Sequence, residues 1–248
     1  MNNPFSLAGK VALVTGANTG IGQAISVSMA QAGARVICAG RSSCDETVAR
    51  IIKAGGRAEY QKLELSEPVA AAALLEKLGP LDILVNNAGI IRRGDAVDFT
   101  ESDWDDVMDV NLKAVFFLSQ AFARSAFARD EGGAVINIAS MLSFQGGIRV
   151  ASYTASKSGV AGITKLLANE WAAKGINVNA IAPGYISTNN TAILQADPAR
   201  NQAILDRIPA GNWGTPADIG DTAVFLASKA AKYIHGAILN VDGGWLAR

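Results

Sequence analysis

Histidine and cysteine are scarce in this sequence, and their scarcity excludes several kinds of site. The 248 residues include one histidine, His235, and two cysteines, Cys38 and Cys44. A histidine-rich metal centre cannot be built from these, and the GxSxG turn of serine hydrolases is missing, so we expect no metal and no Ser-His-Asp chemistry. Neither cysteine lies in a CxxC spacing, which indicates structural roles in a cytoplasmic protein. His235 is interpreted as a turn or packing residue.

An excess of charge and a long apolar run are also missing. Lysine plus arginine and aspartate plus glutamate each number 22, whereas binding to nucleic acid or to an anionic membrane requires clustered basic residues. No apolar run approaches the roughly 18 to 20 residues that span a bilayer, and the first ten residues, MNNPFSLAGK, lack the basic start and apolar middle of a signal peptide. We therefore expect a cytoplasmic protein without nucleic-acid or membrane partners that acts on a small molecule.

Short β-branched runs alternate with amphipathic helical segments along the whole chain. This pattern predicts one doubly wound α/β domain over residues 1–248, with a parallel seven-stranded sheet and helices on both faces. Strands are expected at 10–15, 35–40, 58–65, 82–88, 134–140, 176–183 and 237–243. Helices are expected at 20–32, 44–54, 67–78, 101–126, 152–174 and 216–228, with stop signals at Gly33, Gly55, Gly79 and Gly175. Polar turn residues and short apolar pieces mix in segment 184–214, which we interpret as an inserted lid over the substrate.

A glycine-rich turn, TGANTGIG, lies between the first strand and the first helix. Gly16, Gly20 and Gly22 let the backbone turn tightly and approach a pyrophosphate, whose charge the helix start attracts. In dinucleotide-binding folds an acidic residue at the end of the second strand selects NAD. This chain has Gly40 and Arg41 there, which favours NADP, although Arg41 also fits a solvated surface charge. The NNAG motif at 86–89 is interpreted as a further cofactor contact at the end of the fourth strand.

Tyr153 and Lys157 share one helix face about 6 Å apart, because they are separated by four positions. Ser140, at the end of the fifth strand, precedes them and can converge on the same point. A phenol that exchanges protons near neutral pH needs a pKa lower by roughly 2 to 3 than its ordinary value of about 10, which corresponds to about 3 to 4 kcal/mol. An ammonium at about 4 Å supplies a similar energy. The spacing therefore predicts that Lys157 lowers the pKa of Tyr153.

In their order and spacing these motifs, with Asn111 in VNLKAVFF, resemble the short-chain dehydrogenase/reductase family from about residue 8 to the end. The resemblance implies a Rossmann-type domain, a homotetramer and NAD(P)-dependent catalysis. It also implies that Tyr153 is the acid/base, that Ser140 orients the carbonyl, that Lys157 lowers the tyrosine pKa and holds the ribose, and that Asn111 supports a water relay. The candidate cofactor-binding residues are Gly16, Asn18, Thr19, Gly20, Ile21, Gly22, Gly40, Arg41, Asn87, Ala88, Gly89, Tyr153, Lys157, Pro183, Gly184 and Ile186.

Further stretches, among them GIIRRGDA at 89–96 and VDGGWLAR at 241–248, resemble a subgroup of this family that handles keto-deoxy sugar acids from uronate polymers such as pectin or alginate. A sugar acid needs a cation for its carboxylate and polar partners for its hydroxyls. Arg149 is the first candidate for the cation, followed by Arg92 and Arg93, although each also fits an ion pair. The candidates for the hydroxyls are Gln145, Asn189 and Asn190, whereas Trp213 and Trp245 are expected to pack.

Three alternatives stay open at the level of sequence. A dinucleotide-sensing module would bind the cofactor without turnover, but it has no use for Ser140, Tyr153 and Lys157 together. An epimerase or dehydratase would use the same pair with a tightly held cofactor, but the chain has no separate substrate domain after the sheet. A dehydrogenase of another small carbonyl compound would share every motif except those of the subgroup.

Overall fold

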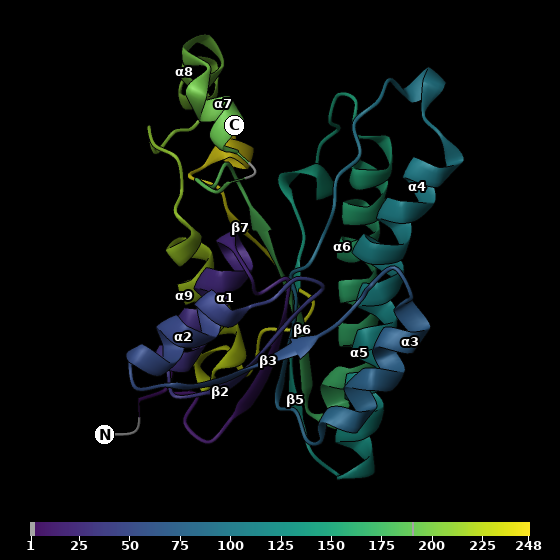
Figure 1. Ribbon diagram of the computed structural model, residues 1–248, viewed down its shortest axis with the longest axis vertical. Coiled ribbons are helices and arrows are strands. Elements are labelled where there is room, and N and C mark those ends of the chain that lie inside the picture. The colour runs from purple at the N-terminus through teal and green to yellow at the C-terminus, as the bar shows by residue number, and fades with distance from the viewer. Residues whose placement is uncertain (1–2, 190) are drawn as a thin grey trace.

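Seven parallel strands form one sheet in the computed structural model, which describes residues 3–189 and 191–248 (Figure 1). Their order across the sheet is β3-β2-β1-β4-β5-β6-β7, and all six pairings are parallel. The predicted fold class is therefore confirmed. The strands are β1 (Val11–Thr15), β2 (Arg35–Gly40), β3 (Arg57–Lys62), β4 (Ile83–Asn86), β5 (Gly133–Ile138), β6 (Ile176–Pro183) and β7 (Ile238–Val241).

Helices cover both faces of the sheet, as Figure 1 shows. One face carries α1 (Gly20–Gln31), α2 (Asp45–Lys53) and α9 (Pro216–Ala227), and the other carries α3 (Pro68–Leu75), α4 (Glu101–Met108), α5 (Ala114–Ala128) and α6 (Ala151–Trp171). Each layer has its own apolar core. Met29 of α1 packs with Ile219 of α9 in the first, and Phe122 of α5 packs with Leu167 of α6 in the second. Burial on both faces explains why the central strands are continuously apolar.

The strand order places β1 and β4 side by side at the centre. Val14 of β1 is paired with Cys38 of β2 on one side and with Val85 of β4 on the other. The chain winds outward through β2 and β3, then crosses back to β4 and winds the other way. In open parallel sheets a crevice forms at such a reversal, beyond the carboxyl ends of the strands. That edge is the upper one in Figure 1.

Two predicted elements differ from the structure for identifiable reasons. The strand expected at 58–65 ends at Lys62, because its only neighbour, β2, ends at Gly40, with which Lys62 pairs. The helix expected at 101–126 is divided by a π-helical turn, η3 (Asp109–Lys113). A single wide turn leaves the apolar periodicity readable on each side of it, so the sequence pattern does not reveal it. The predicted helix stops are confirmed, since Gly33, Gly55, Gly79 and Gly175 all have positive φ.

The segment 184–214 forms two short helices, α7 (Ala192–Ala196) and α8 (Pro198–Leu205), which stand above the carboxyl edge of the sheet in Figure 1. A small apolar cluster anchors the segment. Ile204 and Ile208 pack there with Met141 and Trp245, which lie after β5 and β7. Tyr185 and Trp213 join the cluster edge to face, with ring centroids 5.3 Å apart. The expectation that Trp213 and Trp245 pack is therefore confirmed.

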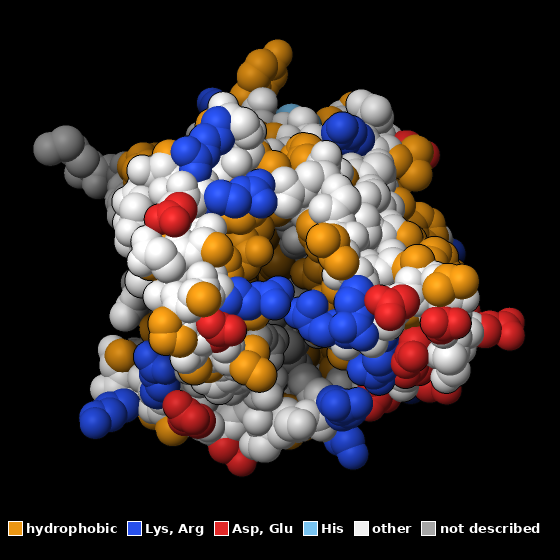
Figure 2. Space-filling view, turned by 90° about the horizontal axis from the view of Figure 1, so that it is seen from above, with side chains coloured by type: hydrophobic (Ala, Val, Ile, Leu, Met, Phe, Trp, Pro, Cys, Tyr) orange, Lys and Arg blue, Asp and Glu red, His pale blue; other side chains and the backbone are white. Residues whose placement is uncertain are grey.

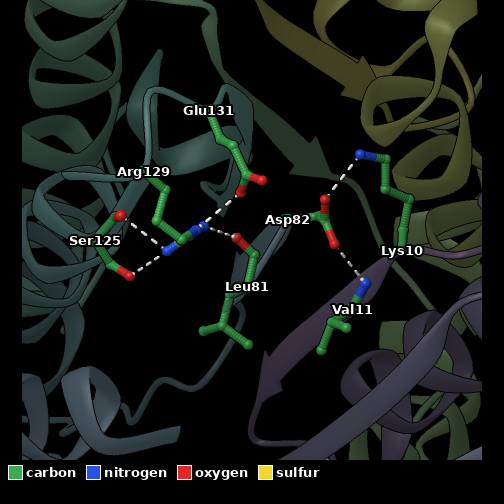
Figure 3. Close-up of polar contacts among 7 residues, drawn as sticks. All are labelled: Lys10, Val11, Leu81, Asp82, Ser125, Arg129 and Glu131. Carbon is green, nitrogen blue, oxygen red and sulfur yellow. Dashed lines mark hydrogen bonds and ion pairs between the residues drawn. The ribbon is translucent and has the colours of Figure 1, made fainter. Parts of the chain in front are cut away.

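Ion pairs and backbone contacts fix the opposite, amino edge of the sheet (Figure 3). The Asp82 carboxylate accepts hydrogen bonds from Lys10 Nζ at 2.7 Å and from the Val11 backbone N–H at 2.9 Å, so the loop before β4 is tied to the start of β1. Arg129 pairs with Glu131 at 2.8 Å and also reaches the Leu81 carbonyl at 3.4 Å. These contacts hold the strand starts in register, far from the crevice.

Both cysteines are buried, and their environment makes them unreactive. Burial raises the pKa of the Cys38 thiol to about 12 and that of the Cys44 thiol to about 11. A thiol that stays protonated is a poor nucleophile and metal ligand, which agrees with structural roles. Across the described residues no cluster of three histidine, cysteine or acidic side chains is placed to hold a metal ion. No helix within the described part of the chain is both long enough and apolar enough to pass through a membrane.

Candidate active site

Most of the predicted site residues lie along the carboxyl edge of the sheet, in the loops after β1, β2, β4, β5 and β6. Figure 2 looks onto this edge and shows lysine and arginine side chains extending across a hollow whose walls are apolar. Positive charge beside an apolar cleft suits a small anionic ligand better than a neutral one.

The glycine-rich turn brings backbone without side chains close to the start of α1. A Cβ at Gly22 would lie 2.1 Å from the Gly16 carbonyl oxygen and 2.4 Å from Asn87 Nδ2, so no side chain fits there. Gly16 has φ +65°, a conformation that favours glycine. Thr19, at the N-cap of α1, makes no side-chain capping bond, so the first amides of this 12-residue helix face the turn uncapped. A dinucleotide pyrophosphate fits this arrangement of free N–H groups and helix dipole.

The NNAG motif holds the glycine-rich turn in place. The Thr15 hydroxyl accepts hydrogen bonds from the backbone N–H groups of Asn87 and Ala88, each at 3.0 Å. Asn87 Nδ2 donates to the Thr15 carbonyl at 2.8 Å and to the Gly16 carbonyl at 3.3 Å. These polar groups of Asn87 and Ala88 are therefore engaged with β1 and position the turn. Gly89, the last residue of the motif, faces the reacting end of the site instead.

The end of β2 carries a glycine and an arginine in place of an acidic residue. A Cβ at the buried Gly40 would be tightly enclosed, 3.2 Å from the Ser42 carbonyl and 3.4 Å from Cys44 Sγ, whereas Arg41 beside it is exposed. At the end of β6, a Cβ at Gly184 would lie 2.5 Å from Asp242 Cα, so this glycine permits two backbone segments to meet. Ile186 follows, buried and bridged to Gly214.

Ser140, Tyr153 and Lys157 converge where β5 meets α6. Ser140 caps the short helix η4 (Met141–Ser143) by accepting a hydrogen bond from the Leu142 N–H at 3.1 Å, and its hydroxyl also faces that of Tyr153. The buried Lys157 ammonium lies 5.7 Å from the centroid of the Tyr153 ring and donates to the Ile138 carbonyl at 2.6 Å. The predicted convergence of a strand-end hydroxyl with the first turn of the helix is thus present.

The net pKa shift of Tyr153 in this structure is opposite in direction to the lowering predicted from the Lys157 spacing. Burial raises the pKa of the phenol above its ordinary value, and hydrogen bonding to Ser140 and the charge of Arg93 oppose this only in part. The Lys157 ammonium is directed at the Ile138 carbonyl and the face of the ring, which limits its effect on the phenol oxygen. Burial also lowers the pKa of Lys157 itself, to about 8. Tyr153 is therefore protonated at neutral pH.

Asn111 lies at the centre of η3 and is fully buried. Its Oδ1 accepts from the Ile90 N–H at 2.8 Å and its Nδ2 donates to the Ile90 carbonyl at 2.9 Å, so both ends of the amide hold one backbone position. A Cβ at Gly89 would lie 3.3 Å from Asn111 Oδ1 and 3.8 Å from Lys157 Nζ. Asn111 thus fixes the loop after β4 against the reacting pair. A π-helical turn at such a point is typical of functional sites.

The residues predicted to bind the sugar acid do not all lie together in the structure. Arg92 is held by Asp106 at 2.9 Å and Asp103 at 3.4 Å on the outer side of α4. Asn189 lies beside the glycine-rich turn, 3.4 Å from Thr19 Oγ1. Gln145 is half-buried after η4, and Asn190 lies outside the described residues.

Arg149 and Arg93, the other two arginine candidates, differ in their surroundings. Arg149 has φ +62°, pairs with Asp95 at 3.1 Å and is 60% exposed. Arg93 is the guanidinium whose charge reaches Tyr153. Of the three arginines, Arg93 is thus the one whose charge acts on the Tyr153 pKa, whereas Arg92 and Arg149 are held in ion pairs by aspartates.

Sequence reasoning missed a buried polar network behind the site. Asn86 Nδ2 donates to Asn137 Oδ1 at 2.9 Å, and Asn137 Nδ2 donates to Thr164 Oγ1 at 2.9 Å, which links β4, β5 and α6. All three residues are nearly or fully buried. A polar residue inside an otherwise apolar strand was the available signal, because a buried polar side chain needs hydrogen-bond partners. Within this network Asn86 Oδ1 is buried without one.

Lys157 makes a testable contribution to stability, because its pKa falls from 10.5 in the unfolded chain to about 8 when buried. Between these values the folded state has lost a proton that the unfolded state keeps, so the free energy of unfolding rises with pH. Lys157→Met removes the free-energy cost of burying this ammonium group. The variant's stability relative to wild type should therefore be most favourable at pH 7 and fall by about 3 kcal/mol as pH approaches 10.5. Urea unfolding of the cofactor-free enzyme at both pH values measures the change.

Lys165→Met provides the matched control, at an exposed position two turns further along α6. If the two variants showed the same pH dependence relative to wild type, burial of the Lys157 ammonium would not be its cause.

Known proteins resemble the chain over nearly its whole length. A family model described as enoyl-(acyl carrier protein) reductase matches residues 16–246. The 2-dehydro-3-deoxy-D-gluconate 5-dehydrogenases of Dickeya dadantii (strain 3937) and Escherichia coli (strain K12) are both 56% identical, covering 99% and 98% of this chain and the same shares of their own lengths. A crystal structure from Agrobacterium tumefaciens with bound NADP is 66% identical, covers 100% of both chains and has a TM-score of 0.96. The chain therefore belongs to the short-chain dehydrogenase/reductase family and is an NAD(P)-dependent oxidoreductase.

Proposed function

We propose that this enzyme interconverts a carbonyl and a hydroxyl group on a keto-deoxy sugar acid formed in the breakdown of uronate polymers such as pectin or alginate. The observation that carries the proposal is the convergence of the Ser140 hydroxyl, the Tyr153 phenol and the Lys157 ammonium where β5 meets α6. Arg93, an exposed arginine whose charge acts on the phenol, is our candidate for the substrate carboxylate. The names of the relatives from Dickeya dadantii and Escherichia coli support this substrate class.

Each site residue has a role that follows from its surroundings. The cofactor, when bound, supplies or accepts the hydride. Gly16, Gly20 and Gly22 with the start of α1 would hold its pyrophosphate, the space at Gly40 and Arg41 its adenosine end, and Gly89, Lys157 and the segment 183–186 its other end. Asn18, Thr19 and Ile21 line the same turn, which Asn87 and Ala88 hold in place. Asn111 fixes Gly89 and Ile90 beside Lys157, where it would support the expected water relay.

Tyr153 would act as the proton donor in reduction. Because burial keeps its pKa above the ordinary value, the phenol carries its proton at neutral pH and can deliver it to the developing alkoxide of a reduced carbonyl. The Ser140 hydroxyl, which faces the same point, can donate to the carbonyl oxygen and orient it. Lys157, with a pKa of about 8, exchanges its own proton close to working pH and can help to reload the phenol.

NADP is the cofactor that the end of β2 favours. Gly40 carries no acidic side chain that would repel a 2′-phosphate, and the exposed Arg41 can reach one. The related structure from Agrobacterium tumefaciens holds NADP. NAD stays the alternative, because the glycine-rich turn carries Thr19 in place of a second basic residue.

The whole chain would act as one cofactor-binding and catalytic domain, with 184–214 as a lid over the substrate.

We further infer a cytoplasmic homotetramer. Leu166 on α6, Trp104 on α4 and Leu239 on β7 are large apolar side chains that stay 38 to 47% exposed in the isolated chain, as expected of surfaces that meet another copy. Light scattering of the purified enzyme measures the assembly, and a monomer would exclude it.

The substrate proposal is tested by following the absorbance of NADH and NADPH separately with the keto-deoxy sugar acids that pectin and alginate lyases produce. Rapid NADPH oxidation supports both substrate and cofactor, whereas rapid NADH oxidation with negligible use of NADPH would reverse the cofactor assignment. Turnover of simple ketones alone would point to another small carbonyl substrate. Cofactor binding without any turnover would support the dinucleotide-sensing alternative.

Arg93→Met is expected to raise KM for the sugar acid about 10- to 150-fold, because a charge-assisted contact with a carboxylate contributes about 1.5 to 3 kcal/mol. KM for the cofactor should change little. Arg92→Met removes the neighbouring guanidinium, which Asp103 and Asp106 hold on the outer side of α4, and is expected to change KM less than threefold. Steady-state kinetics of both variants decide the assignment. An effect confined to Arg92→Met would overturn it.

A further inference from the structure

Trp245 lies at the junction between the turn after β7 and the lid. The turn is built by Asp242, whose carboxylate accepts from the N–H of Gly244 at 2.9 Å and from that of Leu246 at 3.0 Å. The indole is 5% exposed. Its ring is packed against Arg207, whose guanidinium carbon lies 3.9 Å from a ring centroid, and against Tyr185, 4.9 Å between centroids. A side chain held from several directions has one orientation.

The indole N–H is directed at the amide of Gln145. Trp245 Nε1 lies 3.3 Å from Gln145 Oε1. An indole N–H can only donate, so the atom of Gln145 that it meets must be the carbonyl oxygen rather than the amide nitrogen. The contact therefore fixes which way the amide is turned. Its NH₂ group, with two donors, is left facing away from Trp245, and no hydrogen bond among the described residues uses that nitrogen.

Gln145 is itself held beside the reacting groups. Its backbone N–H donates to the Met141 carbonyl at 3.2 Å, and η4 connects it directly to Ser140. The side chain is half-buried, between the loop after β5 and the cluster at the base of the lid. A fixed amide at this place would meet a ligand that enters the hollow under the lid.

We infer that Trp245 is a positioning residue that turns the Gln145 amide so that its NH₂ group donates to an oxygen acceptor of the substrate, a carboxylate oxygen in the first place. This inference rests on the proposed sugar-acid substrate and specifies how the acid is recognised. A free glutamine side chain accepts and donates equally well, whereas one fixed by an indole presents donors only. The site would thereby discriminate in favour of the acid over its neutral analogue.

The test compares three variants of the full-length enzyme, using one keto-deoxy sugar acid and the neutral ketose of the same chain length. Trp245→Phe keeps the packed ring and removes the N–H, and we expect KM for the acid to rise about fivefold, as for the loss of one neutral hydrogen bond. Gln145→Glu retains an acceptor for Trp245 but presents an oxygen to the substrate. We expect kcat/KM to fall about 30-fold for the acid and much less for the ketose, because two acceptors repel each other.

Trp213→Phe is the matched comparison, because Trp213 Nε1 donates to Asn201 Oδ1 at 2.8 Å within the lid without touching Gln145. It removes the same kind of bond, so the preference for acid over ketose should fall in Trp245→Phe and Gln145→Glu but not in Trp213→Phe. Equal loss of preference in both tryptophan variants, or an unchanged preference in Gln145→Glu, overturns the inference. If the wild-type enzyme reduces no sugar acid, the proposed function fails instead.

Discussion

Replacing Tyr153 with phenylalanine is expected to lower kcat by about 10³-fold or more while the dissociation constant of the cofactor changes less than twofold. The substitution removes the only phenol that faces Ser140 among the described residues, and with it the proton donor. A positioned acid contributes about 10²- to 10⁴-fold to such steps. Ring packing is retained, so binding should persist. Absorbance assays measure kcat, and fluorescence titration with NADPH measures binding.

Tyr233→Phe supplies the control, because Tyr233 is 94% exposed and lies between α9 and β7. It should retain wild-type kcat. A Tyr153→Phe enzyme with substantial activity would remove Tyr153 from the mechanism, whereas loss of cofactor binding together with activity would show that the variant had disturbed the fold.

Gly22→Ala is expected to weaken cofactor binding by about 100-fold or more and to destabilise the protein by about 1 to 3 kcal/mol. The new Cβ would lie 2.1 Å from the Gly16 carbonyl oxygen, a backbone atom that a small rotation of a side chain cannot move away. Relief requires α1 to shift from the glycine-rich turn, which removes the amides that would meet the pyrophosphate. Calorimetric titration with NADPH and thermal unfolding measure the two effects.

Gly162→Ala is the matched substitution in another helix. Nothing lies within 4 Å of a Cβ at Gly162, an exposed position on α6. We expect it to stabilise the protein by up to about 1 kcal/mol, because alanine loses less backbone entropy in a helix than glycine. Unchanged cofactor affinity in Gly22→Ala would contradict the assignment of the turn to the pyrophosphate.

The two ends of the site differ in how far the sequence predicts them. The sequence predicts the position of the glycine-rich turn, with Gly16, Gly22 and the run of amides after β1. Such a tight turn between a buried strand and a helix depends on local backbone sterics. Ser140, Tyr153 and Lys157 are also predicted to converge, since parallel strands end at the same edge and residues four apart share a helix face.

The direction of the Tyr153 pKa could not be predicted in this way. The estimate from spacing assumes an ammonium aimed at the phenol oxygen, whereas Lys157 donates to the Ile138 carbonyl, and burial of the phenol dominates. Burial depends on how β5, η4 and α6 pack together, which no local pattern specifies. The same holds for the π-helical turn at Asn111, because one extra residue in a turn leaves the helical periodicity readable on both sides.

The sequence by itself thus determined the sheet, its helices, the glycine-rich turn and the reacting pair, because these follow from periodicity, turn sterics and the parallel order of strands. The tertiary structure alone decided which arginines are held in ion pairs and which way the Gln145 amide is turned. Arg92, Arg93 and Arg149 are alike in sequence, but Asp103 and Asp106 hold the first and Asp95 the last. Such choices depend on contacts between segments far apart in the chain, as between Gln145 and Trp245, and long-range packing fixes them.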